Sequence, residues 1–140
     1  MVTLNIKADT ENTAEAMDFV EEELLRCNFP ADLHPEILIA VEEIFVNIAS
    51  YAYKPEEKGD LRISVTINKK AIIQFEDSGQ PFNPLETTTP ELNASIMERE
   101  IGGLGIHFVK NMMDEVEYRY DGGKNIFTII KNTTKQDKVN

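Results

Sequence analysis

Hydrophobic positions along the chain follow two periods, and the order of these periods predicts the fold. A period of two residues, typical of a half-buried strand, occurs near the N-terminus, twice in the middle of the chain and twice near its end. A period of 3.6 residues, typical of a helix with one buried face, occurs between these segments. Strands are therefore expected at 2–6, 61–67, 71–76, 116–120 and 126–130. Helices are expected at about 12–28, after Asp32 to about residue 53, and from Gly102 to about Met112.

The ends and the buried face of the helices are predicted as well. Asp9 and Thr10 are expected to cap the first helix and Asp32 the second, because their side-chain oxygens can accept hydrogen bonds from free backbone amides. The buried stripe of the first helix is expected to consist of Ala14, Met17, Val20, Leu24 and Cys27.

This order of elements predicts an α+β fold. Strands joined by a loop as short as 68–70 should pair antiparallel. We therefore expect a two-layer sandwich, with helices on one face of a mixed, mostly antiparallel sheet. One domain is expected over residues 1–131, followed by a frayed polar tail at 132–140. The polar segment 83–101 is long for a connection and is expected to be a functional lid or disordered.

The second helix carries a narrow polar stripe beside its apolar face. Glu43 and Asn47 lie four residues apart on this stripe, so that the carboxylate and the amide are stacked one above the other. A glutamate can take a proton, and the oxygen of an asparagine side chain suits Mg²⁺. Taken alone, however, the stripe is also what a solvated helix face looks like, and helix statistics favour that interpretation.

Two glycine-containing motifs follow later in the chain. Asp77-Ser78-Gly79 stands at the end of an expected strand and, by itself, is typical of an ordinary turn. Gly102-Gly103-Leu104-Gly105 opens an expected helix. This second motif is either a flexible hinge or a segment that brings backbone amides and a helix N-terminus against phosphate oxygens.

Composition and charge narrow the classes of function. The chain has 140 residues and a formal net charge of −11, which disfavours nucleic acid as a partner. A phosphate ligand would therefore need Mg²⁺, backbone amides or a helix N-terminus. The single cysteine excludes an internal disulfide. With no membrane-spanning apolar run and no signal-peptide pattern, these features predict a soluble cytoplasmic protein that does not insert into a membrane.

Three motifs occur in the order of the pair Glu43 and Asn47, then Asp77-Ser78-Gly79, then Gly102-Gly103-Leu104-Gly105. Together and in this order they resemble the motifs of the GHKL ATPase superfamily, which includes gyrase, the heat-shock chaperone and the sensor histidine kinases. Within that superfamily the chain is similar to the small anti-sigma-factor serine kinases of bacteria. The likeness extends from Val2 to about Lys131 and includes the opening order strand, helix, helix. The runs that carry it further are Asp77–Pro84, Gly102–Ile106 and Met113–Val116.

The resemblance implies roles for individual residues. Asn47 matches the asparagine that binds Mg²⁺, and Glu43 matches the general base that takes a proton from a serine hydroxyl or water. Asp77 matches the carboxylate that accepts a hydrogen bond from the adenine amino group, and Gly79 lets the backbone approach the base. The glycines that match those around the phosphates are Gly102, Gly103 and Gly105.

The activity that the resemblance implies is that of a serine kinase that uses Mg²⁺-ATP and releases ADP. Such a kinase phosphorylates an anti-sigma-factor antagonist protein and controls the availability of a sigma factor, and a homodimer is expected. The alternative is a nucleotide-dependent binding module that transfers no phosphate. A detached histidine-kinase catalytic domain is disfavoured, because the chain has no long helical hairpin with a phospho-acceptor histidine.

Two segments depart from the pattern of the superfamily. Tyr51-Ala52-Tyr53 stands where many relatives have His-Gly-Tyr, and we interpret Tyr51 as a change at the rim of the cleft. Gly123-Lys124-Asn125 stands where some relatives carry Gly-Thr, so a threonine contact to the adenine region is not expected here.

Overall fold

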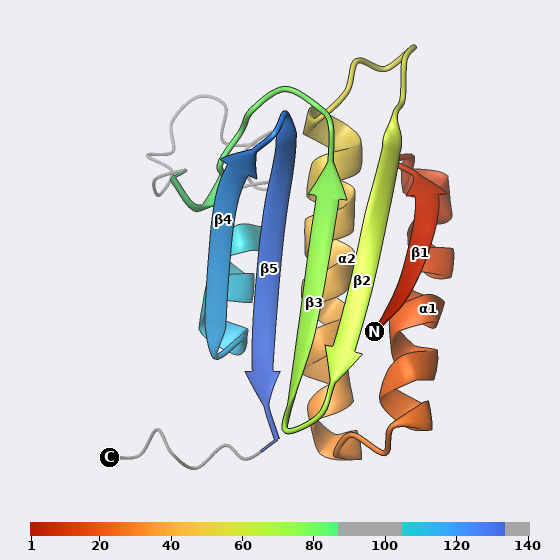
Figure 1. The fold of residues 1–140 in the computed structure, drawn as a ribbon, viewed down its shortest axis with the longest axis vertical. Helices are drawn as coiled ribbons and strands as arrows, with labels where there is room; N and C mark the ends of the chain where they lie inside the picture. Colours follow the sequence, from red (N-terminus) through yellow and green to blue (C-terminus); the bar gives the residue numbers. More distant parts are fainter. Residues whose placement is uncertain (87–104, 134–140) are drawn as a thin grey trace.

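The computed structural model describes residues 1–86 and 105–133, and it consists of a sheet with helices on one of its faces (Figure 1). The sheet has five strands in the order β1-β2-β3-β5-β4. All four pairings are antiparallel. The predicted α+β sandwich is confirmed, with a sheet that is antiparallel throughout its described strands. The strands are β1 (Val2–Lys7), β2 (Asp60–Ile67), β3 (Lys70–Asp77), β4 (Glu115–Asp121) and β5 (Lys124–Asn132).

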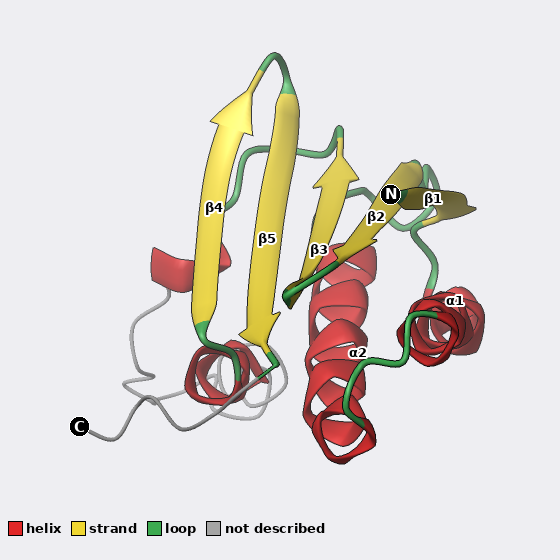
Figure 2. Ribbon diagram, turned by 60° about the horizontal axis from the view of Figure 1, so that its bottom comes forward, coloured by secondary structure: helices red, strands yellow, loops and turns green. Residues whose placement is uncertain are grey.

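The helices cover one face of the sheet and leave the other face open (Figure 2). Two long helices, α1 (Thr13–Arg26) and α2 (His34–Tyr51), lie behind β1, β2 and β3 (Figure 1). A shorter helix at 105–112 lies behind β4 and β5 on the same side. The single-turn 3₁₀ helices are η1 (Thr10–Asn12), η2 (Ala31–Leu33) and η3 (Pro84–Glu86). No helix in the described ranges is long and apolar enough to cross a membrane.

Alternation along the central strands builds the core and also places the polar residues of the site. Because side chains on a strand alternate between faces, Ala71, Ile73 and Phe75 of β3 all point toward the helices and are buried. Asp77 is the next residue of this inward row and is buried as well. In the register of β3 with β5, Asp77 lies opposite Asn125. The core therefore ends in a buried polar pair at one end of the sheet.

The strands predicted at 116–120 and 126–130 are confirmed as β4 and β5, and a tight turn joins them into a hairpin. Gly122 and Gly123 have φ angles of 59° and 79°. Two successive positive φ angles are typical of the tight turns that join antiparallel strands, and glycine adopts them without steric cost. This hairpin holds Asn125 near the start of β5.

Three expectations about the first two helices were wrong. The N-cap of α2 is Leu33, which makes no side-chain cap, because Asp32 is taken up in the preceding turn η2. The Asp9 side chain accepts from the amide of Glu11 and caps η1 instead of α1. Ala14 is exposed and Ala16 is buried in its place. The buried face of α1 is centred near Val20, and at 100° per residue Ala14 points about 120° away from it.

Several predicted features lie outside the described residues. These are most of the expected lid at 83–101, Gly102 and Gly103, and the part of the expected tail beyond residue 133. The start of that tail is part of β5, which continues to Asn132.

Candidate functional site

A pocket lies between the C-terminal half of α2 and the ends of β3 and β5. It brings together Asn47 and Asp77, two residues that the sequence assigned to one site although they are 30 positions apart. The lining residues are Asn47, Ile48, Tyr51, Ala52, Asp77, Gln80, Phe82, Pro84, Tyr118, Asn125 and Phe127. The wall is thus mostly apolar and aromatic, with a few polar groups, as is typical of a small-molecule site.

Asp77 is a buried carboxylate with only 4% of its surface exposed. Its Oδ1 accepts hydrogen bonds from the backbone amide of Gly79 at 2.8 Å and from Nδ2 of Asn125 at 2.9 Å. Burial raises the pKa of Asp77, while these two hydrogen bonds and the charge of Lys124 oppose that increase. Both donors use the same oxygen. Oδ2 accepts no hydrogen bond from the described residues, and Asp77 can offer it to a donor on a ligand.

Asn47 lies on α2 and is 8% exposed. Its side chain makes no hydrogen bond among the described residues, although it is nearly buried and faces the pocket. No group of three or more His, Cys, Asp or Glu side chains that could hold a metal ion occurs among the described residues. A Mg²⁺ ion commonly has one or two protein ligands and completes its shell with water and phosphate oxygens. The amide oxygen of Asn47, which accepts no hydrogen bond from the described residues, fits that kind of site.

Glu43 lies one helical turn before Asn47 and is in contact with Gly105. A Cβ atom added to Gly105 would stand only 2.1 Å from Oε1 of Glu43. The absence of a side chain at Gly105 therefore makes room for the carboxylate. Burial is the main cause that raises the pKa of Glu43, and the charge of Glu42 adds to it. A glutamate with a raised pKa is a better proton acceptor at neutral pH than an ordinary surface glutamate.

A buried lysine links the 105–112 helix to α2. Nζ of Lys131 donates to the carbonyl oxygen of Met112 at 2.6 Å and forms an ion pair with Glu36 at 2.6 Å. Met112 is the last residue of the 105–112 helix, where a cation is favoured by the helix dipole. This link joins the C-terminal end of the 105–112 helix to the first turn of α2.

The turn after β3 packs tightly against the C-terminus of α2. A Cβ atom at Gly79 would lie 2.3 Å from the carbonyl oxygen of Ala52, so only glycine fits there. The amide of Gln80 donates to the same carbonyl oxygen at 3.2 Å. The close approach that requires Gly79 is thus to α2, whereas the predicted approach to a nucleotide base stays a prediction.

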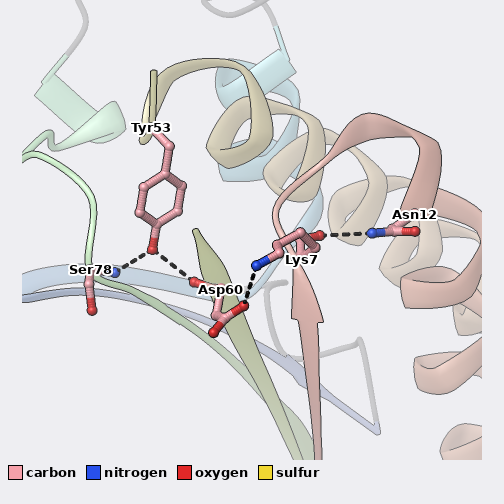
Figure 3. A network of polar contacts seen from close by, with 5 residues as sticks. All are labelled: Lys7, Asn12, Tyr53, Asp60 and Ser78. Carbon is pink, nitrogen blue, oxygen red and sulfur yellow. Dashed lines mark hydrogen bonds and ion pairs between the residues drawn. The ribbon is translucent and has the colours of Figure 1, made fainter. Parts of the chain in front are cut away.

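Tyr53 supports this turn from the other side, a role that the sequence did not indicate. Its hydroxyl accepts from the amide of Ser78 at 2.8 Å and donates to the carbonyl oxygen of Asp60 at 2.8 Å (Figure 3). The side chain of Asp60 in turn pairs with Lys7 at 3.3 Å. The end of α2, the start of β2 and the turn after β3 are therefore tied together beside the pocket.

Two exposed aromatic rings stand at the mouth of the pocket. Tyr51 and Phe82 are 40% and 42% exposed, and their ring centroids are 6.3 Å apart. Both residues line the pocket. The expectation that Tyr51 lies at the rim of a cleft is thus confirmed.

Comparison with protein families and curated proteins agrees with this arrangement. The profile of the family described as histidine kinase-like ATPase domain matches residues 6–131. A serine/threonine-protein kinase, BtrW of Bordetella bronchiseptica, is 21% identical over 96% of this chain and 95% of its own length. The serine-protein kinase RsbW of Listeria monocytogenes is 29% identical over 89% of this chain and 83% of its own length.

Solved structures show the same fold. The structure of the RsbU and RsbW domains of Rv1364c from Mycobacterium tuberculosis superposes with a TM-score of 0.62 at 13% identity and covers 94% of this chain. The chain spans about a third, 32%, of that longer protein. The catalytic domain of the histidine kinase ThkA superposes with a TM-score of 0.52 at 13% identity, and the match covers 96% of this chain and 99% of that catalytic-domain chain.

Proposed function

Because the chain belongs to the histidine kinase-like ATPase domain family, we propose that it is a protein serine kinase whose pocket binds ATP and ADP. The observation that supports this proposal is that Asn47 and Asp77 line one pocket, with Glu43 one helical turn before Asn47 on α2. Among the described residues, the side-chain amide of Asn47 and Oδ2 of Asp77 have no hydrogen-bond partner, and burial raises the pKa of Glu43.

We assign the base of the nucleotide to the pocket formed by α2, β3 and β5. The free oxygen of Asp77 would accept a hydrogen bond from the exocyclic amino group of adenine, and the apolar wall would cover the ring. Tyr51 and Phe82 would flank the entrance. A guanine base presents a carbonyl oxygen at the corresponding position, which would meet the carboxylate as a second acceptor.

We assign the phosphates to the region between Asn47 and Gly105. Asn47 would hold Mg²⁺, which neutralises phosphate charge when it is bound. Glu43 would take the proton from a serine hydroxyl as that oxygen attacks the γ-phosphorus and ADP leaves. Gly105, with Gly102 and Gly103 of the same motif, would offer backbone amides to the phosphate oxygens.

By its resemblance to the anti-sigma-factor kinases, the expected phosphate acceptor is a serine on an antagonist protein. By the same resemblance, the protein would sequester a sigma factor, and it would act as a homodimer in the cytoplasm. Residues 1–131 would form the single nucleotide-binding domain. The similarity to proteins named serine/threonine-protein kinase and serine-protein kinase supports the proposed kinase activity.

The test compares phosphate transfer by three proteins: wild type, Glu43→Gln and Glu42→Gln. Each is incubated with Mg²⁺ and γ-labelled ATP together with purified candidate antagonist proteins that carry a serine. Glu43→Gln should lower transfer by roughly two to four orders of magnitude, the usual contribution of a positioned base. It should leave ADP affinity nearly unchanged, because Glu43 does not line the base pocket.

Glu42→Gln is the matched control, because it is the neighbouring residue on the same helix and is exposed. It should transfer phosphate at close to the wild-type rate, because the charge of Glu42 is a smaller cause of the raised pKa of Glu43 than burial. Equal transfer by wild type and Glu43→Gln would contradict the role of Glu43. A wild-type protein that binds ATP but phosphorylates none of the candidate antagonists would favour the nucleotide-dependent binding module.

A further inference from the structure

Asn125 is the centre of a hydrogen-bond cluster that surrounds Asp77. Its Nδ2 donates to Oδ1 of Asp77 at 2.9 Å, to the carbonyl oxygen of Gln80 at 3.0 Å and to that of Gly79 at 3.4 Å. Its Oδ1 accepts from the amide of Phe82 at 3.2 Å and from the hydroxyl of Tyr118. A single buried side chain, 6% exposed, thus contacts three successive parts of the turn after β3.

The chemistry of the partners determines the orientation of the Asn125 amide. The groups around Nδ2 are a carboxylate and two carbonyl oxygens, which can only accept. The amide of Phe82 can only donate, and it faces Oδ1. Turning the amide over would place NH₂ against N–H and oxygen against oxygen. Asn125 is therefore held in one orientation, with its donors toward Asp77.

We propose that Asn125 is a positioning residue for recognition of the adenine base: it holds the carboxylate of Asp77 so that Oδ2 faces the amino group of the ligand. This inference rests on the proposed function. It assigns no contact between Asn125 and the base. Its effect is transmitted through Asp77 and through the backbone of residues 79–82.

The physical reason is the freedom that Asp77 would otherwise have. The carboxylate is held from one side by the amide of Gly79, a neighbour in its own turn. Among the described residues, Asn125 supplies the only hydrogen bond to the side-chain carboxylate of Asp77 that comes from another strand, and it also fixes the turn that carries Gly79. Without Asn125, both the carboxylate and its remaining donor lose their anchor. Loss of this donor would also raise the pKa of Asp77 further, because the hydrogen bond favours the ionised form.

The test measures discrimination between two nucleotides by calorimetric titration. One is ADP and the other is purine riboside 5′-diphosphate, which lacks only the amino group at position 6. Wild type should bind ADP about 10- to 100-fold more tightly than the purine riboside analogue, because this ratio of affinities corresponds to one hydrogen bond to a charged group. In Asn125→Ala and Asn125→Val the ratio should fall by most of this factor, mainly because ADP binds more weakly.

Gln74→Ala provides the matched control. Gln74 is also an amide side chain of the β3–β5 pair, and its Nε2 donates to Oγ1 of Thr128 at 3.3 Å, away from the pocket lining. It should keep the wild-type ratio. Asn125→Val is included because valine suits a strand and has no side-chain donor, and the melting temperature of each variant shows whether it is folded.

A purely structural role would weaken both nucleotides equally, and a retained ratio in the folded Asn125 variants would overturn the inference. Combining Asn125→Ala with Asp77→Asn should lower the ratio no further than Asp77→Asn alone, and additive losses would contradict action through Asp77. If only the inference about Asn125 fails, wild type still discriminates between ADP and the analogue. If the proposed function fails, wild type binds neither nucleotide, so the two failures are distinguishable.

Discussion

Replacing Gly105 with alanine should separate nucleotide binding from phosphate transfer. The added Cβ would lie 2.1 Å from Oε1 of Glu43 and 3.0 Å from its Cδ. The nearest atoms belong to the flexible end of a side chain, so that Glu43 can yield without movement of the backbone. The carboxylate, which is assigned as the base, would be displaced.

The distance sets the expected size of the effect. An ordinary contact between carbon and oxygen is about 3.4 Å, so the carboxylate must retreat by more than about 1 Å from its present position. A displacement of this size in a catalytic group can lower the rate by about 100-fold. Stability should not fall, because alanine is favoured over glycine within a helix by roughly 0.5–1 kcal/mol.

The assay follows transfer of labelled phosphate to the antagonist protein, with ADP affinity and melting temperature measured in parallel. Gly105→Ala should transfer phosphate about 100-fold more slowly while binding ADP with an affinity within a few-fold of wild type. His107→Ala, at an exposed position on the same helix, is the control and should match wild type. A normal transfer rate in Gly105→Ala would refute the idea that Glu43 must occupy the space beside Gly105.

Two further predictions concern stability. Tyr53→Phe removes the hydroxyl that bridges Ser78 and Asp60 and should lower the free energy of unfolding by about 0.5–1.5 kcal/mol for each lost hydrogen bond; an unchanged urea midpoint would contradict this. Asp77→Asn should melt at a higher temperature than wild type at about pH 7.5, because burial raises the pKa of Asp77 in the folded state and makes its ionised form costly. That cost is present above the folded-state pKa and disappears as the pH falls below the unfolded-state pKa. The difference in melting temperature between Asp77→Asn and wild type should therefore shrink toward about pH 4. A difference that stays constant with pH would contradict this prediction.

The sequence predicted the parts of the fold that depend on local periodicity. Alternation over 61–67 and 71–76 indicated β2 and β3, and the four-residue spacing of Glu43 and Asn47 indicated their common place on α2. That Asp32 does not cap α2 was not predictable in this way. A 3₁₀ turn precedes α2 and takes up that residue, and the periodicity of the helix contains no information about such a turn.

The contacts of the site that depend on strand order were not predictable from local pattern. Asn125 and Asp77 are 48 residues apart and meet only because β5 lies between β3 and β4. The sequence shows that Asn125 follows a glycine turn, but it does not show which strand lies beside it. Asn125 therefore entered the sequence interpretation only as a departure from a family pattern. Tyr53 was missed for the same reason, since its partners Ser78 and Asp60 come from two other elements.

Titration with nucleotide in the presence and absence of Mg²⁺ tests the central assignment most directly. Wild type should bind ADP and ATP, and ATP more tightly with Mg²⁺ than without it. Asn47→Ala removes the assigned protein ligand of the metal and should lose most of this Mg²⁺ dependence while it retains the discrimination for adenine that Asp77 provides. Binding of neither nucleotide by wild type at millimolar concentration would contradict the assignment of this pocket to ATP.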